Sequence, residues 1–93
     1  LPYPGEVLRI GSQGEGVLAL QEYLNFISDT YTQIPKTTPD GIFGPGTEAA
    51  VRAFQREFSL PESGIVSAQL WSEITEVYRD LSLGNLSTQG QFY

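Results

Sequence analysis

Cysteine, histidine and methionine are all absent from this chain of 93 residues. Without cysteine there is no disulfide bridge, no thiolate nucleophile and no cysteine-built zinc site. Without histidine the chain lacks the commonest metal ligand and the commonest general base near neutral pH. Ser-His-Asp, Cys-His and HExxH chemistry is therefore excluded for this chain. We expect neither an enzyme nor a bound cofactor or metal ion.

Methionine is missing even from the first position, which is Leu1. We therefore expect the chain to be a piece of a longer protein whose targeting signal lies elsewhere. No signal peptide is recognisable, and no apolar run approaches the ~18–20 residues of a membrane-spanning helix. The sequence predicts no insertion into a membrane.

Basic residues are scarce: five Lys and Arg stand against eleven Asp and Glu, which gives a formal charge of −6. The five are scattered along the chain, whereas nucleic-acid binding depends on clustered positive charge. Nucleic acid and anionic membranes are therefore disfavoured as partners. A neutral or mixed-charge ligand such as a sugar, held by hydrogen bonds and aromatic faces, is compatible with this composition.

Both ends of the chain have the composition of linkers. Residues 1–7 are rich in proline and glycine, and residues 82–93 are polar. We expect one folded domain over residues 8–81 and a linker after it that leads toward a following domain. The final Phe92-Tyr93 echoes the aromatic start of the chain, which fits tandem copies of the unit as well as it fits chance.

Three segments carry apolar residues at helical spacing. Each apolar stripe is too narrow to be buried alone, so the three helices are expected to pack together. The sequence predicts an all-α fold, a small three-helix bundle with short glycine-containing turns before the second and third helices. The stripes are Val17, Leu20, Leu24 and Ile27, then Ala50, Val51, Phe54 and Phe58, then Leu70, Ile74, Val77 and Leu81.

Each of the three helices is preceded by a start signal. Ser12 and Glu15 have the spacing of a capping box before the first helix. Gly44-Pro45 places a proline at the first position of the second helix, where it is tolerated. Ser67 is the expected N-cap of the third helix.

Two sequence patterns occur twice. Val-x-x-Leu-Gln-x-x-Leu at residues 17–24 returns 34 residues later as Val-x-x-Phe-Gln-x-x-Phe. Asp-Gly-Ile-Phe-Gly at residues 40–44 returns 23 residues later as Ser-Gly-Ile-Val-Ser. In each copy the glycine supplies the turn, and the two apolar residues, a short β-like piece, pin the turn to the bundle.

Gln21 and Gln55 interrupt the apolar stripes at equivalent places and point partly inward. A buried amide is costly unless its donors and acceptor are paired. We expect each glutamine to bond the backbone of a neighbouring loop and to hold it on the helix, with direct ligand contact as the alternative. Trp71, at helical spacing, is expected in the core.

Three blocks of sequence make a specific pattern. The first is Leu8-x-x-Gly-Ser-x-Gly-Glu-x-Val-x-x-Leu-Gln-x-x-Leu24. The second is Asp40-Gly-Ile-Phe-Gly-Pro-x-Thr-Glu-Ala-Ala-Val-x-Ala-Phe-Gln55, and the third is Leu60-Pro-x-x-Gly-Ile-Val66 followed by Leu70-Trp71. Together they cover about residues 8–80 and resemble the peptidoglycan-binding domain family, most specifically in the second block.

The resemblance implies a three-helix module without catalysis that attaches a neighbouring hydrolase or surface protein to cell-wall peptidoglycan. It also implies an extracellular place in the cell wall or spore envelope of Gram-positive spore-formers. The chain departs from the family at Leu70, where threonine is usual, and in residues 25–39, a longer connection than is common. The alternative is a protein-interaction or spacer domain that keeps the fold without binding glycan.

A shallow ligand site is predicted around the turn that enters the second helix. Free N–H groups and the positive end of the helix dipole gather there, which suits a stem-peptide carboxylate or a sugar acetamide. The predicted ligand contacts are Tyr31, Asp40, Phe43, Gly44 and Thr47, with Arg52 as an outer contact.

The predicted contacts also have structural alternatives. Asp40 suits an Asx turn, and Phe43 and Thr47 would be a core residue and a helix cap if the turn packs inward. Arg52 stands four residues after Glu48, the spacing of an ordinary exposed ion pair.

Overall fold

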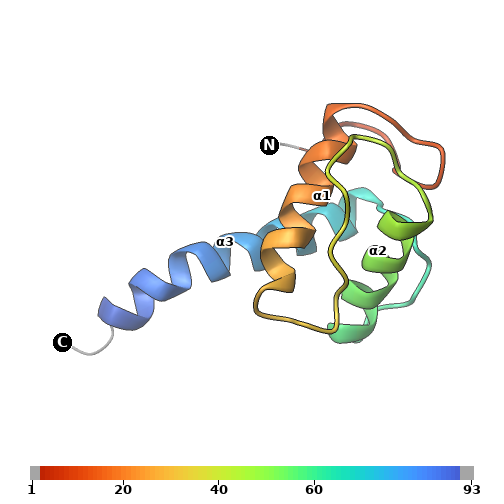
Figure 1. The fold of residues 1–93 in the computed structure, drawn as a ribbon. Helices are drawn as coiled ribbons and strands as arrows, with labels where there is room; N and C mark the ends of the chain where they lie inside the picture. Colours follow the sequence, from red (N-terminus) through yellow and green to blue (C-terminus); the bar gives the residue numbers. More distant parts are fainter. Residues whose placement is uncertain (1–2, 91–93) are drawn as a thin grey trace.

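Three α-helices form in the computed structural model, which describes the backbone of residues 3–90 and the side chains of residues 3–84 (Figure 1). The helices are α1 (Glu15–Ser28), α2 (Pro45–Glu57) and α3 (Ala68–Gly90). No strand occurs in this part of the chain. The predicted all-α fold with three packed helices is confirmed.

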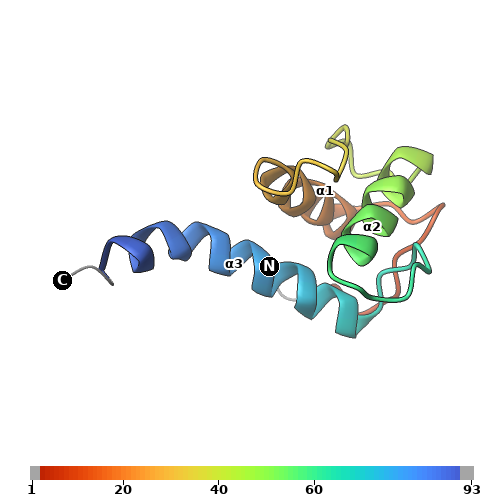
Figure 2. The same ribbon diagram turned by 90° about the horizontal axis from the view of Figure 1, so that it is seen from below.

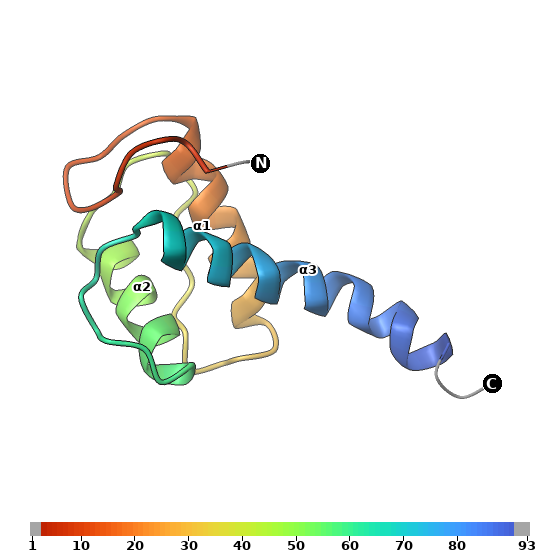
Figure 3. The same cartoon turned by 180° about the vertical axis from the view of Figure 1, so that it is seen from behind.

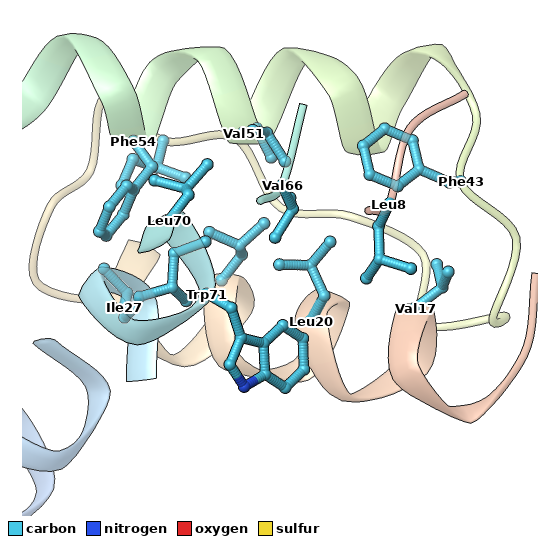
Figure 4. Close-up of a cluster of buried hydrophobic side chains, with 14 of the residues drawn as sticks. Leu8, Val17, Leu20, Ile27, Phe43, Val51, Phe54, Val66, Leu70 and Trp71 are labelled. Carbon is cyan, nitrogen blue, oxygen red and sulfur yellow. The ribbon is translucent and has the colours of Figure 1, made fainter. Parts of the chain in front are cut away.

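α1 is the helix on which the other two pack. α2 and α3 each lie against α1, and within the described residues they make no close backbone approach to one another. Figure 4 shows Val66 and Leu70 between α1 and α2, and Trp71 against α1. Burying one large apolar side chain contributes roughly 1.5–3 kcal/mol to the free energy of folding, so the apolar stripes of the three helices drive their packing. The large side chains of the core are Phe43, Phe54, Trp71, Leu8, Leu20, Leu24, Leu70, Ile27, Ile34 and Ile74.

Two of the three predicted helix starts are confirmed. Pro45 is the first residue of α2, and Ser67 Oγ accepts the Leu70 N–H at 3.2 Å before α3. The prediction for α1 is wrong, because its N-cap is Gly14 at φ +123° with no side-chain cap bond. Ser12 Oγ instead accepts the backbone N–H of Arg9 at 3.0 Å, so its hydroxyl closes the preceding turn.

Two isolated antiparallel bridges tie the N-terminal segment to the repeated turns. Leu8 pairs with Val66, with N···O distances of 3.0 and 2.9 Å, and Gln13 pairs with Ile42. The bridges lie at the two pieces that the sequence predicts to be β-like. Because both turns pair with residues 8–13, they come to the same end of the molecule.

α3 is longer than the sequence predicts. Its apolar stripe ends at Leu81, yet the helix continues to Gly90 and projects beyond α1 and α2 (Figures 1 and 2). Residues 82–90 contain no proline, and extending an existing helix requires far less free energy than starting one. Residues 82–90 are thus helical, and their role as a linker stays a prediction. Phe92-Tyr93 lies outside the described residues.

The N-terminal segment is not entirely detached from the domain. The ring of Tyr3, within the predicted linker 1–7, packs edge-on against Trp71 with centroids 6.1 Å apart. Leu1 and Pro2 lie outside the described residues. Of the helices described, none combines the length and the apolar character needed to cross a membrane.

Candidate functional site

Gln21, buried in α1, joins that helix to the turn before α2. Its Oε1 accepts the Gly41 N–H at 2.8 Å, and its Nε2 donates to the Ile42 carbonyl at 3.0 Å. The same Nε2 lies 3.1 Å from Asp40 Oδ1 and 3.0 Å from Thr47 Oγ1. Both ends of the buried amide are therefore paired within the protein, which is the role that its place in the stripe predicts.

Gln55 forms the same arrangement one repeat later. Its Oε1 accepts the Gly64 N–H at 2.9 Å, and its Nε2 donates to Ser63 Oγ at 3.0 Å. We call these two arrangements the Gln21 lock and the Gln55 lock. Each lock fixes a left-handed turn glycine to a helix. Side-chain bonds to the glutamines thus add to the backbone bridges that tie the same turns to residues 8–13.

Asp40 closes the first turn on itself. Its Oδ1 accepts the Ile42 N–H at 2.9 Å, an Asx turn. That bond, and after it the Gln21 amide, hold the pKa of the Asp40 carboxyl below its ordinary value of 3.8. Asp40 is therefore ionised at neutral pH.

A small pocket of about 160 Å³ lies beside this turn, lined by Gln21, Asp40, Gly44 and Thr47 among others. Three of the predicted contacts thus share one pocket. Because the Asp40 carboxylate stands in its wall, the pocket opposes an anion, and the predicted stem-peptide carboxylate fits it poorly. A neutral group such as an acetamide fits the pocket better.

A second pocket, of about 300 Å³, occupies the equivalent place beside the Gln55 lock. Each lining residue of the first pocket between Thr38 and Thr47 has a counterpart 23 positions later in the lining of the second. The internal repeat in the sequence is thus also a repeat in which positions line a pocket.

Phe43 and Thr47 are placed by the structure inside rather than on the surface. The Phe43 ring is 1% exposed and belongs to the core, so it offers a ligand no side-chain surface (Figure 4). Thr47 is 4% exposed, and its hydroxyl meets Gln21 instead of capping α2, whose N-cap has no side-chain bond. Packing of the turn against residues 11–13 draws Phe43 inward.

Tyr31 and Arg52 are not brought to the predicted site. The Tyr31 ring packs on Phe58 at the C-terminal end of α2, with centroids 4.9 Å apart, at the opposite end of that helix from Thr47. Arg52 pairs with Glu48 at 3.8 Å and donates from Nη1 to the Glu62 carbonyl at 2.5 Å. Arg52 therefore supports the second turn, and Tyr31 closes the far end of the core.

A larger groove of about 480 Å³ is lined by residues of the N-terminal segment, α1 and α3. Figure 3 shows these three backbone segments on one face of the molecule. We call this groove the aromatic groove. Its aromatic rings contact one another in a series, Tyr3 on Trp71 at 6.1 Å, Tyr23 on Trp71 at 5.9 Å and Tyr23 on Tyr78 at 4.6 Å. The polar residues that line it are Ser72, Thr75, Arg79 and Ser82.

Sequence reasoning missed the aromatic groove. From the sequence, Trp71 is expected in the core and Tyr3 falls within the predicted linker 1–7, so neither is expected to line a groove. The signal that was available is the spacing of Ser72, Thr75, Arg79 and Ser82, which puts hydroxyls and a guanidinium on one helix face.

The described residues hold no group of three or more His, Cys, Asp or Glu side chains that could bind a metal ion. Three of the five cations pair with carboxylates, Lys36 with Asp29, Arg52 with Glu48 and Arg56 with Glu62.

Comparison with known sequences gives a family. A family model described as "Putative peptidoglycan binding domain" matches residues 13–74. The spore cortex-lytic enzyme of Bacillus cereus is 33% identical over 87 residues, which cover 92% of this chain and 32% of that enzyme. The chain thus spans about a third of the length of the curated relatives it matches.

Solved structures show the same fold. The N-terminal domain of SleB superposes with a TM-score of 0.69 and 32% identity, covering 82% of this chain and 97% of that domain. A fused Zn-dependent amidase, peptidase and peptidoglycan-binding protein from Clostridium acetobutylicum gives a TM-score of 0.65 and 35% identity. That match covers 74% of this chain and 28% of the fused protein.

Proposed function

This chain belongs to the peptidoglycan-binding domain family, and on that premise we propose that it is a non-catalytic module that binds cell-wall peptidoglycan. In the whole protein it would hold an attached hydrolase or surface domain against its polymeric substrate. Spore cortex-lytic enzymes and an amidase fusion are among its relatives, which supports a place in the cell wall or spore envelope.

The observation that carries the proposal is the family match over residues 13–74. The composition supports binding rather than catalysis, since no histidine or cysteine is present to act as base, nucleophile or metal ligand. Fixed pockets beside the two locks and the aromatic groove offer polar and aromatic surface of the kind that binds sugars and peptides.

The test is depletion from solution. The purified chain would be mixed with insoluble peptidoglycan, and in parallel with cellulose, and the protein left in the supernatant measured. We expect saturable depletion by peptidoglycan alone, with a Kd of ~10 µM to 1 mM, the range of a shallow site. If no protein is depleted even when binding sites on the peptidoglycan are present at about 1 mM, the chain does not bind peptidoglycan, and a spacer or protein-interaction role remains.

A further inference from the structure

The aromatic groove differs from the two pockets beside the locks in charge as well as in size. It measures about 480 Å³, against about 300 and 160 Å³ for the other two. It is also the one of the three whose lining includes a cation, Arg79. In a chain with a net charge of −6, a guanidinium in a pocket singles that pocket out for an anion.

Arg79 is free to meet a ligand. Among the side chains of residues 3–84, Lys36, Arg52 and Arg56 are taken up by carboxylates, whereas Arg79 forms no ion pair. Its side chain is exposed, and the guanidinium fork matches the geometry of a carboxylate. An exposed cation that is unpaired in so acidic a chain is a ready partner for an incoming acidic group.

The aromatic part of the groove suits a pyranose ring. Tyr3, Tyr23 and Tyr78 are half-buried, so each ring is held by packing and still contributes surface to the groove. Rings fixed in this way present an apolar surface without a further loss of side-chain freedom, and a sugar ring has apolar C–H faces to lay on them. A pocket of this volume is within the usual range for a small-molecule ligand.

Hydroxyls complete the polar edge of the groove. Ser72, Thr75, Arg79 and Ser82 follow one another at helical spacing along α3. The Thr75 hydroxyl donates to the Ser72 carbonyl at 3.1 Å, and the Ser82 hydroxyl donates to the Arg79 carbonyl at 3.0 Å. With their hydrogens already used, both oxygens are left as acceptors for the O–H or N–H groups of a saccharide.

From these observations we infer that the aromatic groove binds a saccharide that carries a carboxylate, with the sugar on the tyrosines and the carboxylate on Arg79. A muropeptide with a free peptide carboxylate has this chemistry. The inference rests on the proposed function and goes beyond it in assigning the site to the junction of the N-terminal segment, α1 and α3, and away from the turn before α2.

The experiment compares two single-charge variants of the whole chain, Arg79→Gln and Arg9→Gln. Arg9 is exposed, lies outside the groove and forms no ion pair within the described residues, so Arg9→Gln matches the change in net charge. Binding of a soluble muropeptide is followed by amide chemical shifts, with the neutral N-acetylglucosamine disaccharide as a second probe. Depletion by insoluble peptidoglycan is measured for all three proteins.

For Arg79→Gln we expect muropeptide affinity to fall by about tenfold, the effect of losing a charge-assisted hydrogen bond. Arg9→Gln should bind like the parent, and the neutral disaccharide should bind all three proteins equally. Amide shifts should gather at residues 72–82.

If the parent and Arg79→Gln are depleted equally and the shifts gather at residues 40–47, the groove is the wrong site while the proposed function stands. If the parent is neither depleted nor shifted by either probe, both fail together.

Discussion

Gln21 and Gln55 each use the side-chain Oε1 to accept the backbone N–H of a turn glycine, Gly41 at 2.8 Å and Gly64 at 2.9 Å. The two glutamines stand 34 positions apart in sequence, and their glycines 23. The domain thus uses one device twice to place a turn on a helix. The backbone bridges to residues 8–13 leave the glycine N–H groups unpaired, and each glutamine supplies the acceptor for one of them.

Replacing either glutamine by leucine should lower stability. Gln21→Leu and Gln55→Leu keep the volume but leave the glycine N–H without its acceptor, at a cost of ~1–3 kcal/mol each. Since the two locks bond different turns, the double variant should lose about the sum. Urea unfolding measures the effect, with the exposed Gln33→Leu as the matched control. Normal melting combined with lost peptidoglycan binding would instead put the glutamine in the binding site.

The turn glycines should not tolerate a side chain. Gly64 has φ +72°, and a Cβ there would lie 2.9 Å from Glu48 Cγ and 3.0 Å from Arg52 Nε. We expect Gly64→Ala to lose at least ~1–2 kcal/mol, the cost of the left-handed conformation alone. The measurement is the thermal unfolding of Gly64→Ala, with Gly46→Ala as the control. Gly46 lies in α2, and the position that its Cβ would take is open.

Gly46→Ala is expected to melt at the parent temperature or above it, since alanine favours a helix over glycine by ~0.5–1 kcal/mol. If both alanine variants lose the same amount of stability, the left-handed backbone at Gly64 is not the reason that a glycine is needed there.

Stability should fall in acid partly through Asp40. Its folded-state pKa is lowered, so its contribution to stability is complete above the ordinary pKa of 3.8 and is lost as the pH falls through the folded value. Asp40→Asn keeps an acceptor oxygen for Ile42 but removes the titration. Urea unfolding measured from about pH 5 to pH 2 should therefore show a shallower decline in the variant.

Glu62, whose pKa is lowered by the hydrogen bond from Arg56, contributes in the same direction, so the decline becomes shallower without vanishing. Superimposable profiles for the parent and Asp40→Asn would assign the acid sensitivity elsewhere.

The chain alone should release no soluble fragments from peptidoglycan, with or without added divalent metal. The reason is chemical, because no histidine or cysteine is available and no described carboxylate group forms a metal site. Release of reducing sugars and free amino groups would be followed over a day, with an active peptidoglycan hydrolase as the positive control. Reproducible turnover that one point substitution abolishes would contradict the binding-module interpretation.

Local patterns in the sequence were sufficient for the framework of the fold. Apolar residues at a period of about 3.6 specify amphipathic helices whatever surrounds them, and Ser67 and Pro45 act within one helical turn. The role of the two glutamines could be predicted because a polar residue in an apolar stripe must find a partner. Each of these inferences needs only neighbours along the chain.

What the sequence did not reveal depends on distant segments. Phe43 is buried because residues 11–13 pair with its backbone, and Tyr31 meets Phe58 because the connection after α1 runs back along α2. The aromatic groove needs Tyr3 to cross onto α3, which no periodicity shows. The predicted site therefore kept Asp40, Gly44 and Thr47 around one small pocket and lost the members that tertiary packing placed elsewhere.

Because α2 and α3 both pack on α1, the order in which the helices come together is restricted. α2 is close to α1 in sequence and docks on it through the Gln21 lock, whereas α3 must return across the whole of α2 to reach the same helix. Closing that longer loop is the slower contact to form. The transition state should therefore hold α1 and α2 together before α3 arrives, and substitutions on the inner face of α3, such as Ile74→Val, should speed unfolding more than they slow folding.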